Sequence, residues 1–160
     1  MLSRRVKGKV IIVTGCNSPI GIGRATVHQF AHNGAKAIFV CDYNTQHLET
    51  HKRELNSLYP DVDVHPRQMD AGEEADVERI VNEALEKYGR LDVFFANAGI
   101  SISAERVTDA SAEKFMQVMK TNSLRQEMLC LRSMRTLLTS VQRLSGNEAR
   151  REGHAPNIQG

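Results

Sequence analysis

The chain has 160 residues, of which 41% are hydrophobic and 25% are charged, and its formal net charge is +2. This composition excludes a disordered chain, and the near-neutral charge gives no indication of nucleic acid or a membrane surface as a partner. No apolar run approaches the roughly 18 residues of a membrane span. The basic start leads directly into the first apolar run without a signal peptide, so we expect a cytoplasmic protein. Three scattered cysteines predict neither disulfides nor zinc.

Residues 10–23, VIIVTGCNSPIGIG, are typical of a buried strand, a glycine loop and the start of a helix. This order directs free backbone N–H groups and the positive end of a helix dipole toward one point, which suits a phosphate. The loop is not a nucleotide-triphosphate P-loop, because Gly15 and Gly21 have a different spacing and no Lys-Ser/Thr pair follows. It also lacks the spacing G-x-G-x-x-G.

The second strand is predicted over residues 37–41 and ends at Asp42. Asn44 is expected to cap a helix over residues 45–58. On that helix His47 and His51 lie four residues apart, which we interpret as a solvated helix face and not as a metal site, because no H-E-x-x-H motif is present.

The third strand is predicted over residues 62–68, and Pro66 favours an edge position for it because proline cannot donate to a central ladder. A helix over residues 73–88 and a fourth strand over 91–96 follow. Ser111 is expected to cap a last helix whose apolar positions recur at helical spacing. It runs to about Leu144, so that residues 1–144 form the domain and 145–160 an unstructured tail.

Strands that alternate with helices predict an α/β fold with a Rossmann-type, doubly wound parallel sheet. We expect four strands in the order 3-2-1-4, which is an incomplete version of that fold. Ligands of such sheets bind outside the carboxyl ends of the strands, where the strand order reverses. Four features of this chain fall at those ends: the glycine loop, Asp42, Asp70 and the triplet Asn97-Ala98-Gly99.

Together these residues resemble the front half of a short-chain dehydrogenase/reductase. The family has T-G-x-x-x-G-x-G after its first strand, N-A-G after its fourth and an asparagine about 20 to 25 residues later. Here the matching residues are Thr14-Gly15 with Gly21-Ile22-Gly23, then the triplet at 97–99, then Asn122. The loop segment 16–20 is two residues longer than the family's usual form. We expect the resemblance to end near residue 123, with the chain truncated or altered beyond it.

The resemblance implies a hydride transfer between a nicotinamide cofactor and the carbonyl or alcohol carbon of a small molecule that the sequence does not identify. An acid at Asp42 would bind the adenosine ribose and repel a 2′-phosphate, which favours NAD over NADP, with a simple turn cap as the alternative. Asp70 would hold the adenine amino group, with a helix cap as the alternative. The expected cofactor-binding residues are Gly15, Asn17, Ser18, Gly21, Ile22, Gly23, Asp42, Asp70, Asn97, Ala98 and Gly99.

The family's catalytic residues are mostly missing. Its chemistry uses a tyrosine, a lysine four residues later, a serine, and the asparagine, of which only Asn122 has a counterpart here. No tyrosine follows Tyr88 and no lysine follows Lys120. Two interpretations remain open: an oxidoreductase whose chemistry belongs to a longer form, and a non-catalytic dinucleotide-binding fragment. A third, an S-adenosylmethionine-dependent methyltransferase, is disfavoured by the triplet at 97–99.

One physical consequence follows from the expected loss of the later strands. The strand over residues 91–96 would keep an apolar edge with unpaired N–H and C=O groups. Such an edge is a template for pairing with another chain, so we expect self-association through it.

Overall fold

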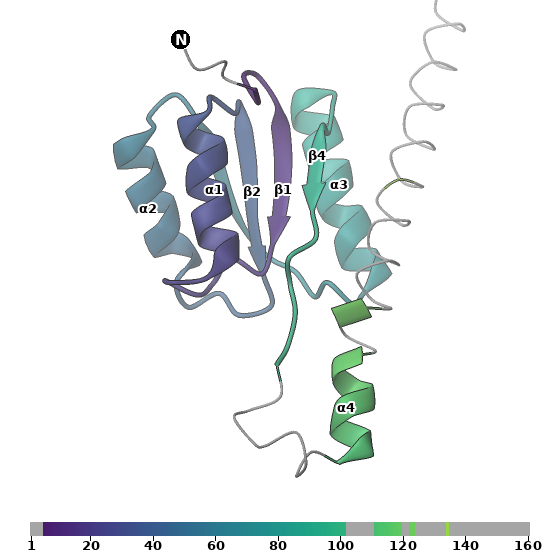
Figure 1. Ribbon diagram of the computed structural model, residues 1–160. Coiled ribbons are helices and arrows are strands. Elements are labelled where there is room, and N and C mark those ends of the chain that lie inside the picture. Colours follow the sequence, from purple (N-terminus) through teal and green to yellow (C-terminus); the bar gives the residue numbers. More distant parts are fainter. Residues whose placement is uncertain (1–4, 102–110, 120–121, 124–133, 135–160) are drawn as a thin grey trace, which may run out of the picture.

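The computed structural model describes residues 5–101, 111–119, 122–123 and 134. A central parallel sheet in the order β3-β2-β1-β4 has helices on both faces (Figure 1), which confirms the predicted fold class and strand order. The strands are β1 (Val10–Thr14), β2 (Ala37–Asp42), β3 (Asp63–Gln68) and β4 (Val93–Phe95). The helices are α1 (Ile22–His32), α2 (Leu48–Leu58), α3 (Glu74–Tyr88) and α4 (Ala112–Met119).

The two central strands are buried on both faces, as their β-branched sequences predict. Side chains of β1 alternate between two hydrophobic clusters: Ile11 and Val13 pack toward α1 and α2, whereas Val10 and Ile12 pack toward α3. This alternation follows from the two-residue period of a strand. Pairing with β2 on one side and β4 on the other places β1 inside the sheet, so the loop that follows β1 lies within the carboxyl edge and not at its end.

Several predicted boundaries differ from the structure. Helix α2 begins at Leu48 instead of residue 45, because the Asn44 Oδ1 accepts the Gln46 N–H at 2.9 Å and forms a turn before the helix. Strand β4 covers only Val93–Phe95. Just before it, the Asp92 N–H donates to the Val10 carbonyl oxygen and the Asp92 carboxylate accepts the Val10 N–H, each at 2.9 Å. Pro66 does lie in the edge strand β3, as expected.

The last described helix differs from the prediction in its packing. The Oγ of Ser111 accepts the Lys114 N–H at 3.2 Å and caps α4 as predicted. However, no residue of α4 is buried, so its apolar stripe does not contribute to the core. Most of the predicted continuation to residue 144 and the whole tail over 145–160 lie outside the described residues. No helix in the described part of the chain is long and apolar enough to cross a membrane.

Candidate cofactor site

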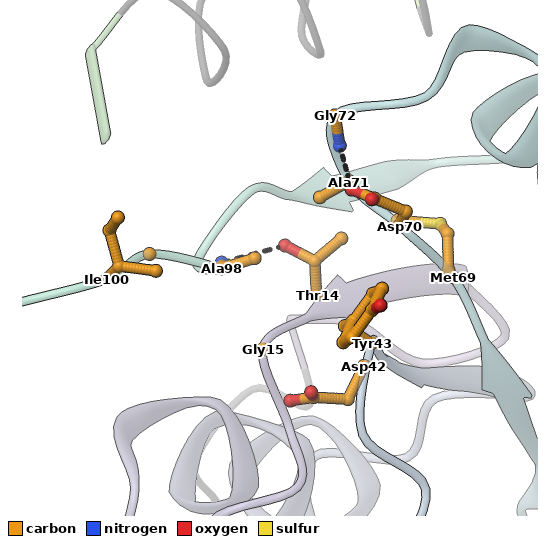
Figure 2. A pocket seen from close by; sticks show the side chains of 11 residues that line it. Thr14, Gly15, Asp42, Tyr43, Met69, Asp70, Ala71, Gly72, Ala98 and Ile100 are labelled. Atoms are coloured by element: carbon orange, nitrogen blue, oxygen red, sulfur yellow. Dashed lines mark hydrogen bonds between the residues drawn. The ribbon is translucent and has the colours of Figure 1, made fainter. Parts of the chain in front are cut away.

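A cavity of about 360 Å³ lies at the carboxyl edge of the sheet, lined by the ends of β1 and β2 and by the segments that follow β3 and β4 (Figure 2). This volume is within the usual range for small-molecule sites. Its position is where the strand order reverses, as in other doubly wound sheets. Its lining residues are Thr14, Gly15, Asp42, Tyr43, Met69, Asp70, Ala71, Gly72, Ala98, Gly99 and Ile100.

The glycine loop is shaped by close backbone approaches. Gly15 has a φ of +71°, and a Cβ there would lie 2.8 Å from the Cα of Ala98. A Cβ at Gly23 would lie 2.3 Å from the carbonyl oxygen of Gly15, so the first turn of α1 packs directly on the loop. Gly21 precedes α1 without a side-chain capping bond. The first N–H groups of α1 therefore remain for water or a ligand, as at other helix N-termini that bind anions.

Thr14 and Asn97 join the loops that follow β1 and β4. The Oγ1 of Thr14 accepts the N–H groups of Asn97 and Ala98, each at 2.9 Å. The Nδ2 of Asn97 donates to the carbonyl oxygens of Thr14 and Gly15 at 3.0 and 3.1 Å. The Asn97 side chain therefore stabilises the carboxyl edge, and one dashed line in Figure 2 marks the bond between Ala98 and Thr14.

Asp42 holds two turns at once. One carboxylate oxygen accepts the Asn17 N–H at 2.8 Å, and the other accepts the Asn44 N–H at 2.9 Å. The turn-capping role considered for this residue is therefore present. The same carboxylate lines the cavity, and each of its oxygens has a second lone pair, so the ribose role stays open beside it.

The middle of the glycine loop is hydrogen-bonded to the start of α2, which corrects the expectation that His47 and His51 mark a solvated helix face. His51 is 3% exposed and does not lie on a solvated helix face. Its Nε2 lies 3.1 Å from the carbonyl oxygen of Asn17. The Oδ1 of Asn17 also accepts the His47 N–H at 2.8 Å. Direct contact of Asn17 with a ligand stays a prediction, and Ser18, which is exposed, accepts the Gly21 N–H through its carbonyl oxygen at 3.2 Å.

Cys16 anchors the start of the same loop. Its side chain is fully buried in the cluster beneath α1 and α2, and its Sγ donates to the carbonyl oxygen of Val13 at 3.3 Å. Burial raises the pKa of the Cys16 thiol to about 12. The thiol therefore stays protonated and acts as a packing group, not as a nucleophile.

Asp70 and Asn122 are both engaged with neighbouring backbone. The Oδ1 of Asp70 accepts the Gly72 N–H at 2.7 Å, so this side chain shapes the turn before α3, whose N-cap is Glu73. The amide of Asn122 pairs with Ile100 in both directions, at 2.8 and 2.7 Å. These bonds place Asn122 next to Gly99, beside the cavity. Its part in the family's chemistry stays a prediction.

Sequence reasoning assigned no site role to Thr14 and His51. The signal for Thr14 was available, because it is the threonine of the T-G pair that opens the loop. No local pattern marks His51, because its contact with the loop joins residues 34 positions apart. Ile22, one of the expected cofactor-binding residues, is 72% exposed at the start of α1 and so is open to a ligand.

Residues 9–146 match the model of the short chain dehydrogenase family. The chain belongs to this family. The match extends past residue 123, where the resemblance was expected to end. Levodione reductase from Leifsonia aquatica is 36% identical over 118 residues, which are 74% of this chain and 43% of the relative. NADP-dependent mannitol dehydrogenase from Alternaria alternata is 32% identical over 117 residues, or 73% of this chain and 43% of the relative.

Solved structures of short-chain dehydrogenases agree with this assignment. A crystal structure of levodione reductase has a TM-score of 0.69 and 31% identity, and the similarity covers 84% of this chain and 50% of that one. Xylitol dehydrogenase with bound NAD⁺ has a TM-score of 0.72 and 26% identity, with 85% and 50% covered. The chain thus spans about half the length of the relatives that it matches.

Proposed function

We propose that this chain is the cofactor-binding half of a short-chain oxidoreductase and binds NAD in preference to NADP. The observation that carries the proposal is the carboxylate of Asp42 at the end of β2, which lines the cavity and is held in place by two backbone N–H groups. A fixed negative charge there favours ribose hydroxyls and repels a 2′-phosphate.

The residues at the carboxyl edge suit a dinucleotide. Gly15 and Gly23 leave no side chain between the loop and the first turn of α1, so a diphosphate can approach the backbone closely. The uncapped start of α1 supplies N–H donors and a positive dipole end for that diphosphate. Asp42, Tyr43 and Asp70 line the same cavity from the ends of β2 and β3, where the adenosine would lie (Figure 2). When bound, the nicotinamide supplies the hydride acceptor or donor.

We further propose that these 160 residues bind the cofactor without catalysing its reaction. General acid–base catalysis near neutral pH needs a group whose pKa is close to that pH. Burial and the hydrogen bond to Asp63 raise the pKa of Tyr88 to about 12, which is the opposite of activation. Tyr59 packs between His28 and His32 at the end of α2, and no lysine follows any tyrosine by four residues.

A fluorescence titration with NADH and NADPH tests the cofactor proposal. We expect saturable NADH binding and at least tenfold weaker NADPH binding, a difference of about 1.4 kcal/mol. Asp42→Asn removes the charge and keeps the size, so it should strengthen NADPH binding relative to NADH. Equal binding of both cofactors by the unaltered chain would contradict the preference for NAD. No saturable binding of either cofactor by folded protein would contradict the proposed function itself.

A further inference from the structure

The lengthened glycine loop is held at one residue by three bonds to the second βα unit. Asn17 donates its N–H to Asp42, accepts the His47 N–H on its Oδ1 and accepts a bond from His51 on its carbonyl oxygen, at 2.8, 2.8 and 3.1 Å. These three bonds, called here the Asn17 contacts, come from the end of β2 and from the start of α2. They join the loop to the wall of the cavity that Asp42 forms.

His51 is the buried member of this group. Because a carbonyl oxygen can only accept, the His51 ring must carry its proton on Nε2. Its Nδ1 is buried and has no hydrogen-bond partner among the described residues. Among the described residues, the ring is therefore hydrogen-bonded through Nε2 alone.

We propose that His51 is a positioning residue for the cofactor: its Nε2–H bond holds the lengthened loop in the shape that receives the diphosphate and ribose. This inference rests on the proposed function, because it concerns how the same site is prepared for NAD. Ordering a flexible residue costs conformational entropy, so two extra loop residues weaken binding unless the fold orders them beforehand. The Asn17 contacts and the ring of Pro19 supply this order.

The experiment compares NADH binding by the unaltered 160-residue chain and by two variants of one residue. His51→Leu fills the buried space without a donor, and His51→Gln restores an N–H donor on a side chain of similar reach. His65→Leu is the matched control: it removes a ring that bonds Tyr88 at 2.6 Å and stacks on Phe39, in the cluster on the other face of the sheet. Thermal unfolding of each protein is measured alongside.

We expect His51→Leu to raise the NADH Kd about tenfold, His51→Gln to recover most of this loss, and His65→Leu to leave the Kd unchanged. A merely structural histidine would lower the unfolding temperature without this pattern in Kd. Unchanged NADH affinity in folded His51→Leu would overturn the inference while the proposed function stands. No NADH binding by the folded, unaltered chain would instead defeat the proposed function.

If His51→Leu does not fold, amide exchange in the unaltered chain decides the question. The His47 N–H reports the Asn17 contacts directly, because it donates to the Asn17 Oδ1. A cofactor that binds only the ordered loop must stabilise that loop by linkage. Saturating NADH should therefore slow exchange of the His47 amide at least tenfold, whereas exchange that NADH leaves unchanged would overturn the inference.

Discussion

Asn97 donates two hydrogen bonds to Thr14, which lies 83 residues earlier in the sequence, at the carboxyl edge of the sheet. Thr14 is 1% exposed and Asn97 is half-buried, so these bonds are partly shielded from water. They join the end of β1 to the loop after β4, and both segments line the cavity. The pair explains why a threonine opens the glycine loop and an asparagine opens the triplet at 97–99, because Thr14 supplies the acceptors and Asn97 the donors.

Thr14→Val should destabilise the protein and weaken cofactor binding. Valine keeps the shape but removes the oxygen that accepts the N–H groups of Asn97 and Ala98. We expect a loss of about 2 to 3 kcal/mol in the free energy of unfolding, measured with urea. Thr14→Ser is the control, because it retains the hydroxyl and should lose less. Equal stability of Thr14→Val and the unaltered chain would show that the hydroxyl is dispensable.

Gly15→Ala should lower the free energy of unfolding much more than Gly89→Ala. Both glycines have positive φ, +71° and +69°, so alanine is strained at each by roughly 1 to 2 kcal/mol. A Cβ at Gly89 meets nothing within 4 Å, whereas one at Gly15 meets the backbone of Ala98 at 2.8 Å. The difference between the two variants in urea unfolding therefore measures the close approach alone. Similar losses in both would contradict the tight packing at Gly15.

Asp92 should make the free energy of unfolding decrease as the pH falls into the acid range. Burial by itself would raise the pKa of this carboxyl, but bonds from Arg90, the Val10 N–H and Lys9 lower the pKa from 3.8 to about 2. Because the pKa of Asp92 is lower in the folded than in the unfolded protein, its carboxylate stabilises the fold at pH values above the unfolded-state pKa. This contribution is lost as the pH falls through the folded-state pKa. The shift corresponds to about 2 kcal/mol at pH 7, of which roughly half is lost by pH 3.

Urea unfolding at several pH values checks this expectation. Asp92→Asn should lose about 2 kcal/mol at neutral pH, with a flatter dependence between pH 4 and pH 2. Asp61→Asn, an exposed control, should follow the unaltered chain. An Asp92→Asn variant with an unchanged acid slope would show that this carboxyl does not carry the dependence.

The outer edge of β4 should lead to self-association. Within the described residues, β4 pairs with β1 only, and its three residues are half-buried. Phe94 packs against the cluster beneath α3, so Phe94→Lys removes this packing as well as placing a charge in the edge strand. The folded variant should show less association by sedimentation velocity. Ile20→Lys is the control, because it removes a 98% exposed apolar side chain from the glycine loop. A single monomer boundary for the unaltered chain at high concentration would refute the prediction.

The sequence determined the fold class, the strand order and the edge of the sheet at which the cavity lies, because these depend on local patterns. A buried β-branched strand, a glycine loop and a helix in series specify a βαβ unit, and right-handed crossovers then leave few arrangements of the sheet. Pro66 placed β3 at an edge by the same kind of reasoning, since its missing N–H excludes a central position. The Asn-Ala-Gly triplet at 97–99 and the carboxylate of Asp42 marked the carboxyl edge, because each directly follows an apolar run of strand length.

Only the tertiary structure decided which hydrogen bonds join segments that lie far apart in the sequence. Nothing local to α2 shows that His51 is buried against Asn17, because the contact depends on how α2 packs beside the loop. The bond between the Asp92 carboxylate and the Val10 N–H, beside the start of β4, likewise joins residues 82 positions apart. A hydrogen bond between distant segments is made or lost by a difference of a few tenths of an ångström in the donor–acceptor distance, and the sequence period carries no information at that scale.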